Sequence, residues 1–97
     1  MKIIYTDRAA DDLEALSAYL TPTSRQGARN VQSAILKTLA NLSIFPHSGR
    51  LQTAIGVRKI GTRTYPYLIY YTVEDDAEEI IILTIQHAAR EREFTDQ

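Results

Sequence analysis

The chain has 97 residues, of which 44% are hydrophobic and 24% charged, and its formal net charge is −1. These values are typical of one globular domain spanning residues 1–97 and leave little room for a second. Cysteine is absent and the two histidines are far apart, so we expect no disulfide, metal or other cofactor. No signal peptide or membrane-spanning run is recognisable, so a cytoplasmic location is expected.

The N-terminal half predicts one strand and two helices. Residues 2–5 are β-prone, and Thr6-Asp7 then offers a pair of N-cap residues. Apolar side chains at helical spacing predict a helix from Arg8 to Leu20, and residues 21–24 end it and supply caps for a second helix. The apolar stripe of a second helix comprises Ala28, Val31, Ile35, Leu39 and Leu42. Because the link is short, the two helices should form an antiparallel hairpin.

The C-terminal half predicts three strands, at residues 57–60, 67–73 and 79–86. Residues 46–56 carry turn and loop residues and have no predicted element, whereas residues 88–94 form either a last helical turn or a tail. The order is β-α-α-β-β-β. It predicts the α+β class, with a helical hairpin packed on one face of an antiparallel sheet.

Alternation along the last two predicted strands divides their side chains between two faces. One face comprises Tyr67, Ile69, Tyr71, Val73, Ile81, Leu83 and Ile85. The other comprises Leu68, Tyr70, Thr72, Ile80 and Ile82. Two helices cover only one face of such a sheet, so the second face should expose an apolar patch. A patch of this kind indicates a protein partner or a second copy of the chain.

The charged residues are segregated along the sequence. No Asp or Glu lies between Glu14 and Glu74. The same interval contains seven cations, which are Arg25, Arg29, Lys37, Arg50, Arg58, Lys59 and Arg63. The second helix and the middle of the sheet should therefore form a basic surface. On charge alone, this surface is either a solvated face or a contact for nucleic acid or for an acidic protein segment.

Four short motifs follow the predicted helices along the sequence. They are Gly49-Arg50, Gly56-Val57-Arg58, the run from Tyr65 to Tyr71, and the run from Ile85 to Arg90. In this order the chain resembles the RelE/ParE superfamily of type II toxin–antitoxin systems over nearly its whole length. The resemblance implies a toxin that is neutralised by a cognate antitoxin in a hetero-oligomer. The antitoxin would cover the exposed sheet face at Leu68, Tyr70, Ile80 and Ile82.

The superfamily has two main branches. ParE-like members inhibit DNA gyrase without a hydrolytic site, whereas RelE-like members are ribosome-dependent, metal-independent mRNA endoribonucleases. The strand from Tyr65 to Tyr71 and the ending His87-Ala88-Ala89-Arg90 resemble the ParE branch more closely, so gyrase inhibition is the expected activity. Two alternatives stay open: a RelE-like endoribonuclease, and a non-toxic relative that only binds its antitoxin. Whether the protein is an enzyme is therefore not decided by the sequence.

The nuclease alternative assigns specific roles. The unperturbed pKa of histidine lies near neutral pH, so His87 would be the acid or base, and Arg90 and Arg58 would complete the catalytic group. Phosphate or target binding would involve Arg50, Arg58, Lys59, Arg63 and Arg90. The C-terminal Tyr of several RelE-like nucleases is absent, since no Tyr follows Tyr71. Structural roles are equally open: His87 bonded to the backbone, and Arg58 paired with Glu74 or Glu79.

Overall fold

The computed structural model describes residues 1–90, which form two helices, five strands and a short 3-10 turn. The elements in chain order are β1 (Lys2–Tyr5), α1 (Asp7–Leu20), α2 (Arg25–Ile44), β2 (Arg50–Leu51), β3 (Val57–Gly61), β4 (Tyr67–Glu74), β5 (Glu79–His87) and η1 (Ala88–Arg90). The predicted α+β class and element order are confirmed. The difference is β2, a two-residue strand in the segment for which the sequence predicts no element.

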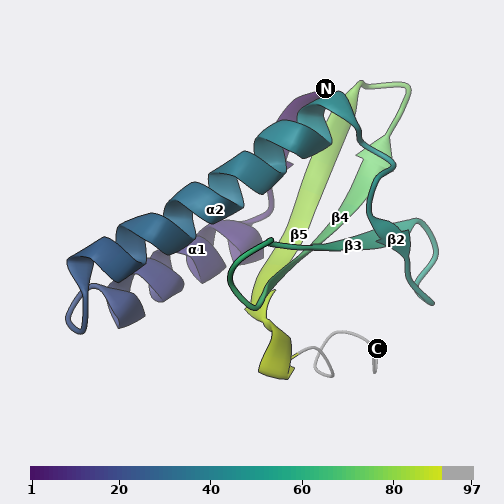
Figure 1. Cartoon of the computed structure of the whole chain (residues 1–97). Helices are drawn as coiled ribbons and strands as arrows, with labels where there is room; N and C mark the ends of the chain where they lie inside the picture. Colours follow the sequence, from purple (N-terminus) through teal and green to yellow (C-terminus); the bar gives the residue numbers. More distant parts are fainter. Residues whose placement is uncertain (91–97) are drawn as a thin grey trace.

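Both helices begin where the sequence predicts. The Thr6 side chain accepts a hydrogen bond from the Ala9 N–H at 3.0 Å, and the Ser24 side chain accepts one from the Gly27 N–H at 2.9 Å. Each therefore satisfies an N–H group that has no partner inside its helix. The buried residues of α2 are the five of the predicted apolar stripe. Residues of the stripe pack in one core cluster with side chains of the sheet. Helices α1 and α2 lie side by side as a hairpin (Figure 1).

The sheet has the strand order β1-β5-β4-β3-β2. Strands β2 to β5 pair with their neighbours antiparallel, as predicted, whereas β1 pairs with β5 in parallel. The sheet is thus mixed, because the first strand lies beside the last and runs parallel to it. The helical hairpin packs on one side of the sheet (Figure 1). Among residues 1–90, no helix combines the length and the apolar character needed to cross a bilayer.

A β-bulge in β5 corrects the predicted division into two faces. In register, Tyr70 lies opposite Thr84 but Tyr71 lies opposite Ile82, so Leu83 is the extra residue. An extra residue reverses the alternation on one side of the bulge. Ile80 and Ile82 therefore face the helices, and both are fully buried in the core. Their predicted position on the open face is wrong.

The other predicted residues of the open face are only partly available. Leu68 and Thr72 are half-buried, and Thr72 lies opposite Ile81 in register. Tyr70 alternates with the core residues Ile69 and Tyr71 but has no exposed surface. The apolar patch expected on this face is therefore smaller than the sequence predicts.

Helix α1 is fixed to β5 by a partly buried polar contact. The Asp12 Oδ2 atom accepts hydrogen bonds from the Thr84 hydroxyl at 2.5 Å and from the Ile85 N–H at 3.0 Å. Both donors belong to fully or nearly fully buried residues. One carboxylate thus satisfies two donors just beyond the bulge, where β1 has already ended.

Candidate functional site

Residues 46–49 form a loop, called the Gly49 loop below, that is held against the sheet by Tyr71. The Tyr71 hydroxyl donates to the Pro46 carbonyl at 2.9 Å and accepts from the Gly49 N–H at 2.8 Å. Burial raises the pKa of Tyr71, and the hydrogen bond from Gly49 and the charge of Arg58 oppose that rise. A hydroxyl that stays protonated can serve as donor and acceptor at once, which this bridge requires.

Arg58 completes the same loop anchor. Its Nη1 atom donates to the Gly49 carbonyl at 2.8 Å and to the His47 carbonyl at 3.1 Å. The structure therefore places these donors on the loop backbone rather than on Glu74 or Glu79, the partners expected from the sequence. A guanidinium used in this way stabilises the loop.

Gly49 is required by close approach. A Cβ atom at this position would lie 2.5 Å from the Tyr71 hydroxyl oxygen, 2.8 Å from Tyr71 Cε1 and 3.0 Å from the Lys59 carbonyl oxygen. Such distances are shorter than real contacts allow, so only glycine fits without a shift of the loop. The Gly49 motif is thus explained by packing against Tyr71, a residue 22 positions away in sequence.

The hairpin that follows carries Arg50 and Lys59, two predicted target-binding cations, in addition to Arg58. Arg50 on β2 lies opposite Lys59 on β3, and the two strands are joined by residues 52–56. Gly56 has φ +76, and the Val57 N–H donates to the Ala54 carbonyl at 3.1 Å, which closes the turn. The turn presents Ile55 with 101% relative exposure, and Leu51 beside it is 59% exposed. The sequence did not single out these two apolar side chains.

His87 lies at the other end of the sheet, opposite Tyr67 in register. The two rings meet edge to face with centroids 5.4 Å apart, and the His87 Nδ1 atom accepts from the Ala89 N–H at 3.1 Å. The backbone bond agrees with the structural role left open by the sequence, although His87 is exposed. His87 lines a groove of about 520 Å³ together with Arg8, Asp12 and Tyr19.

The structure does not bring the predicted catalytic residues together. Arg58 lies opposite Tyr71, and His87 lies opposite Tyr67. Four residues of strand separate these positions, which is about 13 Å along β4. The side chain of Arg90 lies outside the described part of the structure. Arg63 lies on the turn between β3 and β4, next to α2. Among the described residues, no cluster of three or more His, Asp or Glu could hold a metal ion.

Comparisons of the sequence with known proteins identify a family and a relative. A family model described as the ParE toxin of the type II toxin–antitoxin system parDE matches residues 3–92. Toxin RelE2 of Caulobacter vibrioides is 33% identical over 89 residues, covering 92% of this chain and 97% of that protein.

Solved structures show the same arrangement of elements. The chromosomal ParDE toxin–antitoxin system of P. aeruginosa contains a chain of 26% identity and TM-score 0.74, with coverage of 90% of this chain and 95% of that one. The intact RelBE toxin–antitoxin complex of E. coli matches with TM-score 0.65 and 19% identity over 90% of this chain and 95% of that one, a similarity of fold. The chain belongs to the ParE toxin family of type II toxin–antitoxin systems.

Proposed function

We propose that this toxin inhibits DNA gyrase by protein–protein contact and is neutralised by a cognate antitoxin. The observation that carries the proposal is the separation of His87 from Arg58. Metal-independent RNA cleavage needs an acid, a base and phosphate-binding cations around one phosphate. In the described residues, Arg58 is bonded to the Gly49 loop and His87 lies about 13 Å further along the sheet. The match to the ParE family and the likeness to the ParDE system support the same conclusion.

The β2–β3 hairpin is the proposed contact with gyrase. Leu51 on β2 and Ile55 in the turn offer exposed apolar anchors, and Arg50 and Lys59 lie opposite each other on the two strands. Protein interfaces commonly combine a few apolar anchors with a charged rim that sets orientation. The Gly49 loop, held by Tyr71 and Arg58, positions the start of this hairpin.

The reaction that tests the proposal contains purified toxin, gyrase, supercoiled DNA and ATP. Cleaved DNA should accumulate, and Ile55→Ser should reduce it at least tenfold. The matched control is Leu36→Ser, which removes an exposed apolar side chain from α2 and should leave the cleavage unchanged. Absence of cleaved DNA together with ribosome-dependent mRNA cleavage would assign a RelE-like activity instead. No growth arrest on expression without the antitoxin would identify a non-toxic relative.

The antitoxin contact is proposed on the sheet face opposite the helices, around Leu68. Ile80 and Ile82 are excluded from it, because both are buried in the core. Thr72 and Ile81, which lie opposite each other in register and are half-buried, extend the contact along the strands. Leu68→Asp should weaken antitoxin binding, as measured by calorimetry, while leaving the helical signal unchanged. Unaltered affinity would place the antitoxin elsewhere.

A further inference from the structure

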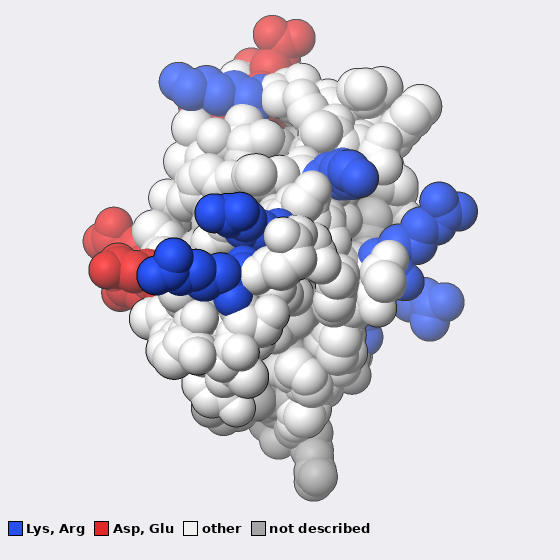
Figure 2. Space-filling view, turned by 60° about the vertical axis from the view of Figure 1, so that its left-hand side comes forward, with Lys and Arg blue, Asp and Glu red and all other residues white. Residues whose placement is uncertain are grey.

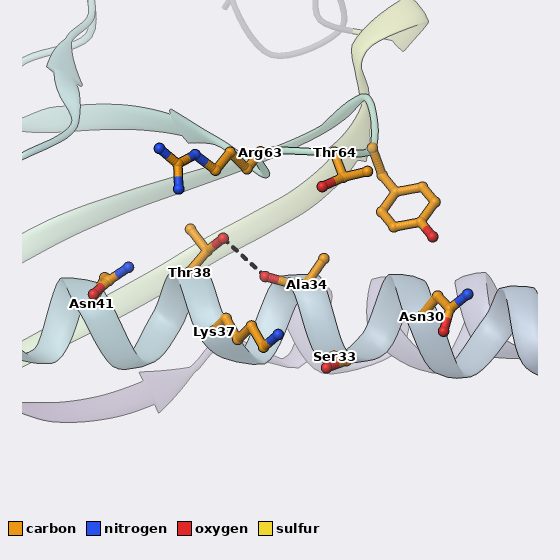
Figure 3. Close-up of a pocket in the computed structure, with 9 residues that line it drawn as sticks. Asn30, Ser33, Ala34, Lys37, Thr38, Asn41, Arg63 and Thr64 are labelled. Carbon is orange, nitrogen blue, oxygen red and sulfur yellow. Dashed lines mark hydrogen bonds between the residues drawn. The ribbon is translucent and has the colours of Figure 1, made fainter.

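A polar groove lies between α2 and the turn that joins β3 to β4. Its volume is about 450 Å³. One wall is a strip of α2 that comprises Asn30, Ser33, Ala34, Lys37, Thr38 and Asn41. The other wall is the turn, where Arg63 and Thr64 face the helix across the groove (Figure 3). Among the described residues that line the groove, every side chain except Ala34 carries a polar group, and none is a carboxylate.

The wall formed by the turn is held in place by its own backbone. The Thr62 N–H donates to the Tyr67 carbonyl at 3.0 Å, and the Thr62 hydroxyl donates to the Tyr65 carbonyl. The Tyr67 N–H also donates to the Tyr65 carbonyl at 2.9 Å. Arg63 and Thr64 thus project from a turn that is ordered before any ligand binds, which lowers the entropic cost of binding.

The charged side chains among the described residues that line the groove are of one sign. The groove residues fall within the part of the sequence that has no Asp or Glu, between Glu14 and Glu74. From the side of the molecule on which the helical hairpin projects, Lys and Arg are spread across the surface and Asp and Glu lie at its margins (Figure 2). Lys37 and Arg63 are both exposed and stand on opposite walls. This surface attracts anions, and the net charge of −1 conceals it.

We propose that this groove binds the sugar–phosphate backbone of a nucleic-acid strand without reading its sequence, with Lys37 and Arg63 neutralising phosphates from opposite walls. Arg, Lys, Asn, Ser and Thr are the side chains that proteins use for contacts with phosphate and sugar. An interface with a protein segment would need an apolar or aromatic anchor in its centre. Within residues 1–90, the only aliphatic side chain that lines the groove is Ala34, and Tyr65 is partly buried against the core.

Salt dependence of binding tests this proposal without gyrase or ribosomes, so its outcome is independent of the proposed function. Fluorescence anisotropy would follow labelled single-stranded DNA, single-stranded RNA and duplex DNA between 50 and 200 mM salt. For a single strand, each phosphate contact adds about 0.7 to the slope of log affinity against log salt concentration. The double substitution Lys37→Gln/Arg63→Gln should therefore lower the slope by about 1.4. Across this salt range, that is about sevenfold less loss of affinity.

The matched control is Lys2→Gln/Arg25→Gln, which removes the same charge from exposed positions that do not line the groove. Its slope should equal that of the unmodified protein. Equal slopes for both double variants, or no binding at 50 mM salt, would overturn the proposal. Binding of poly-glutamate but of no polynucleotide, lost in the groove variant, would also overturn it and assign an acidic protein segment. The affinities for the three nucleic acids show which of them the groove prefers.

Discussion

The two ends of β4 differ in what their tyrosines do. At one end, Tyr71 is fully buried and bridges Pro46 and Gly49 through its hydroxyl. At the other end, Tyr67 is half-buried beside the exposed ring of His87 and lines an open groove. Burial is the main cause of the raised pKa at both residues, and the charge of Tyr19 adds to it at Tyr67. The comparison indicates that the motif residues near Tyr71 maintain the fold, whereas the end near Tyr67 tolerates change.

The largest effect is expected at Gly49. Gly49→Ala places a Cβ atom 2.5 Å from the Tyr71 hydroxyl oxygen, so the loop and the hairpin after it must shift. We expect a loss of about 3 kcal/mol or more in the free energy of unfolding, measured by urea denaturation. Gly61→Ala is the control, because its nearest atoms lie at 3.7 and 3.8 Å, and its stability should change by less than about 1 kcal/mol. Equal losses for the two variants would contradict the proposed close contact.

The bulge at Leu83 predicts opposite behaviour for two adjacent isoleucines. Ile82→Ala removes a fully buried side chain from the core and should cost about 2–5 kcal/mol. Ile81→Ala, on the half-buried open face, should cost clearly less. Denaturation of both variants in urea measures the difference. If Ile81 proves the more costly, the alternation is unbroken and the register across the bulge is wrong.

Tyr71→Phe sharpens the comparison between the two ends directly. It leaves the buried Gly49 N–H without its acceptor, for an expected loss of about 1–3 kcal/mol. Tyr67→Phe, at the open end of the strand, should change the free energy of unfolding by less than about 0.5 kcal/mol. Thermal unfolding followed by circular dichroism compares the two variants. Similar losses would mean that the hydroxyl bridge contributes little.

High pH should weaken the bridge that the Tyr71 hydroxyl forms between Pro46 and Gly49. The pKa of Tyr71 is raised in the folded state, so the neutral hydroxyl is favoured there. Its contribution to stability is complete below the ordinary tyrosine pKa of about 10 and is lost as the pH rises through the folded-state pKa. Tyr71→Phe should therefore have a flatter stability profile above pH ~10 than the unmodified protein. Tyr5 and Tyr67 also have raised pKa values, so some dependence should persist.

A small effect is also expected at His87. His87→Ala removes an exposed ring and one hydrogen bond with the Ala89 N–H, so the free energy of unfolding should change by about 1 kcal/mol or less. If the toxin inhibits gyrase without a hydrolytic site, growth arrest by this variant should equal that of the unmodified protein. Loss of toxicity with unchanged stability and antitoxin affinity would instead support a catalytic histidine.

Local signals in the sequence were enough for most of the fold. The caps at Thr6 and Ser24 and the stripe from Ala28 to Leu42 predicted both helices, because helix ends and amphipathic faces depend on residues only a few positions apart. The three C-terminal strands also begin at the predicted residues, Val57, Tyr67 and Glu79. The short motifs indicated the toxin superfamily for the same reason, since their order along the chain can be recognised without coordinates.

The tertiary structure alone decided which residues meet. One extra residue at Leu83 moved Ile80 and Ile82 from the predicted open face into the core, because strand alternation has a period of two and any insertion reverses it. The parallel pairing of β1 with β5, the bridge from Tyr71 to Gly49, and the groove that joins Lys37 to Arg63 depend on contacts between distant segments. Such contacts follow from packing the whole chain, so no local pattern predicts them.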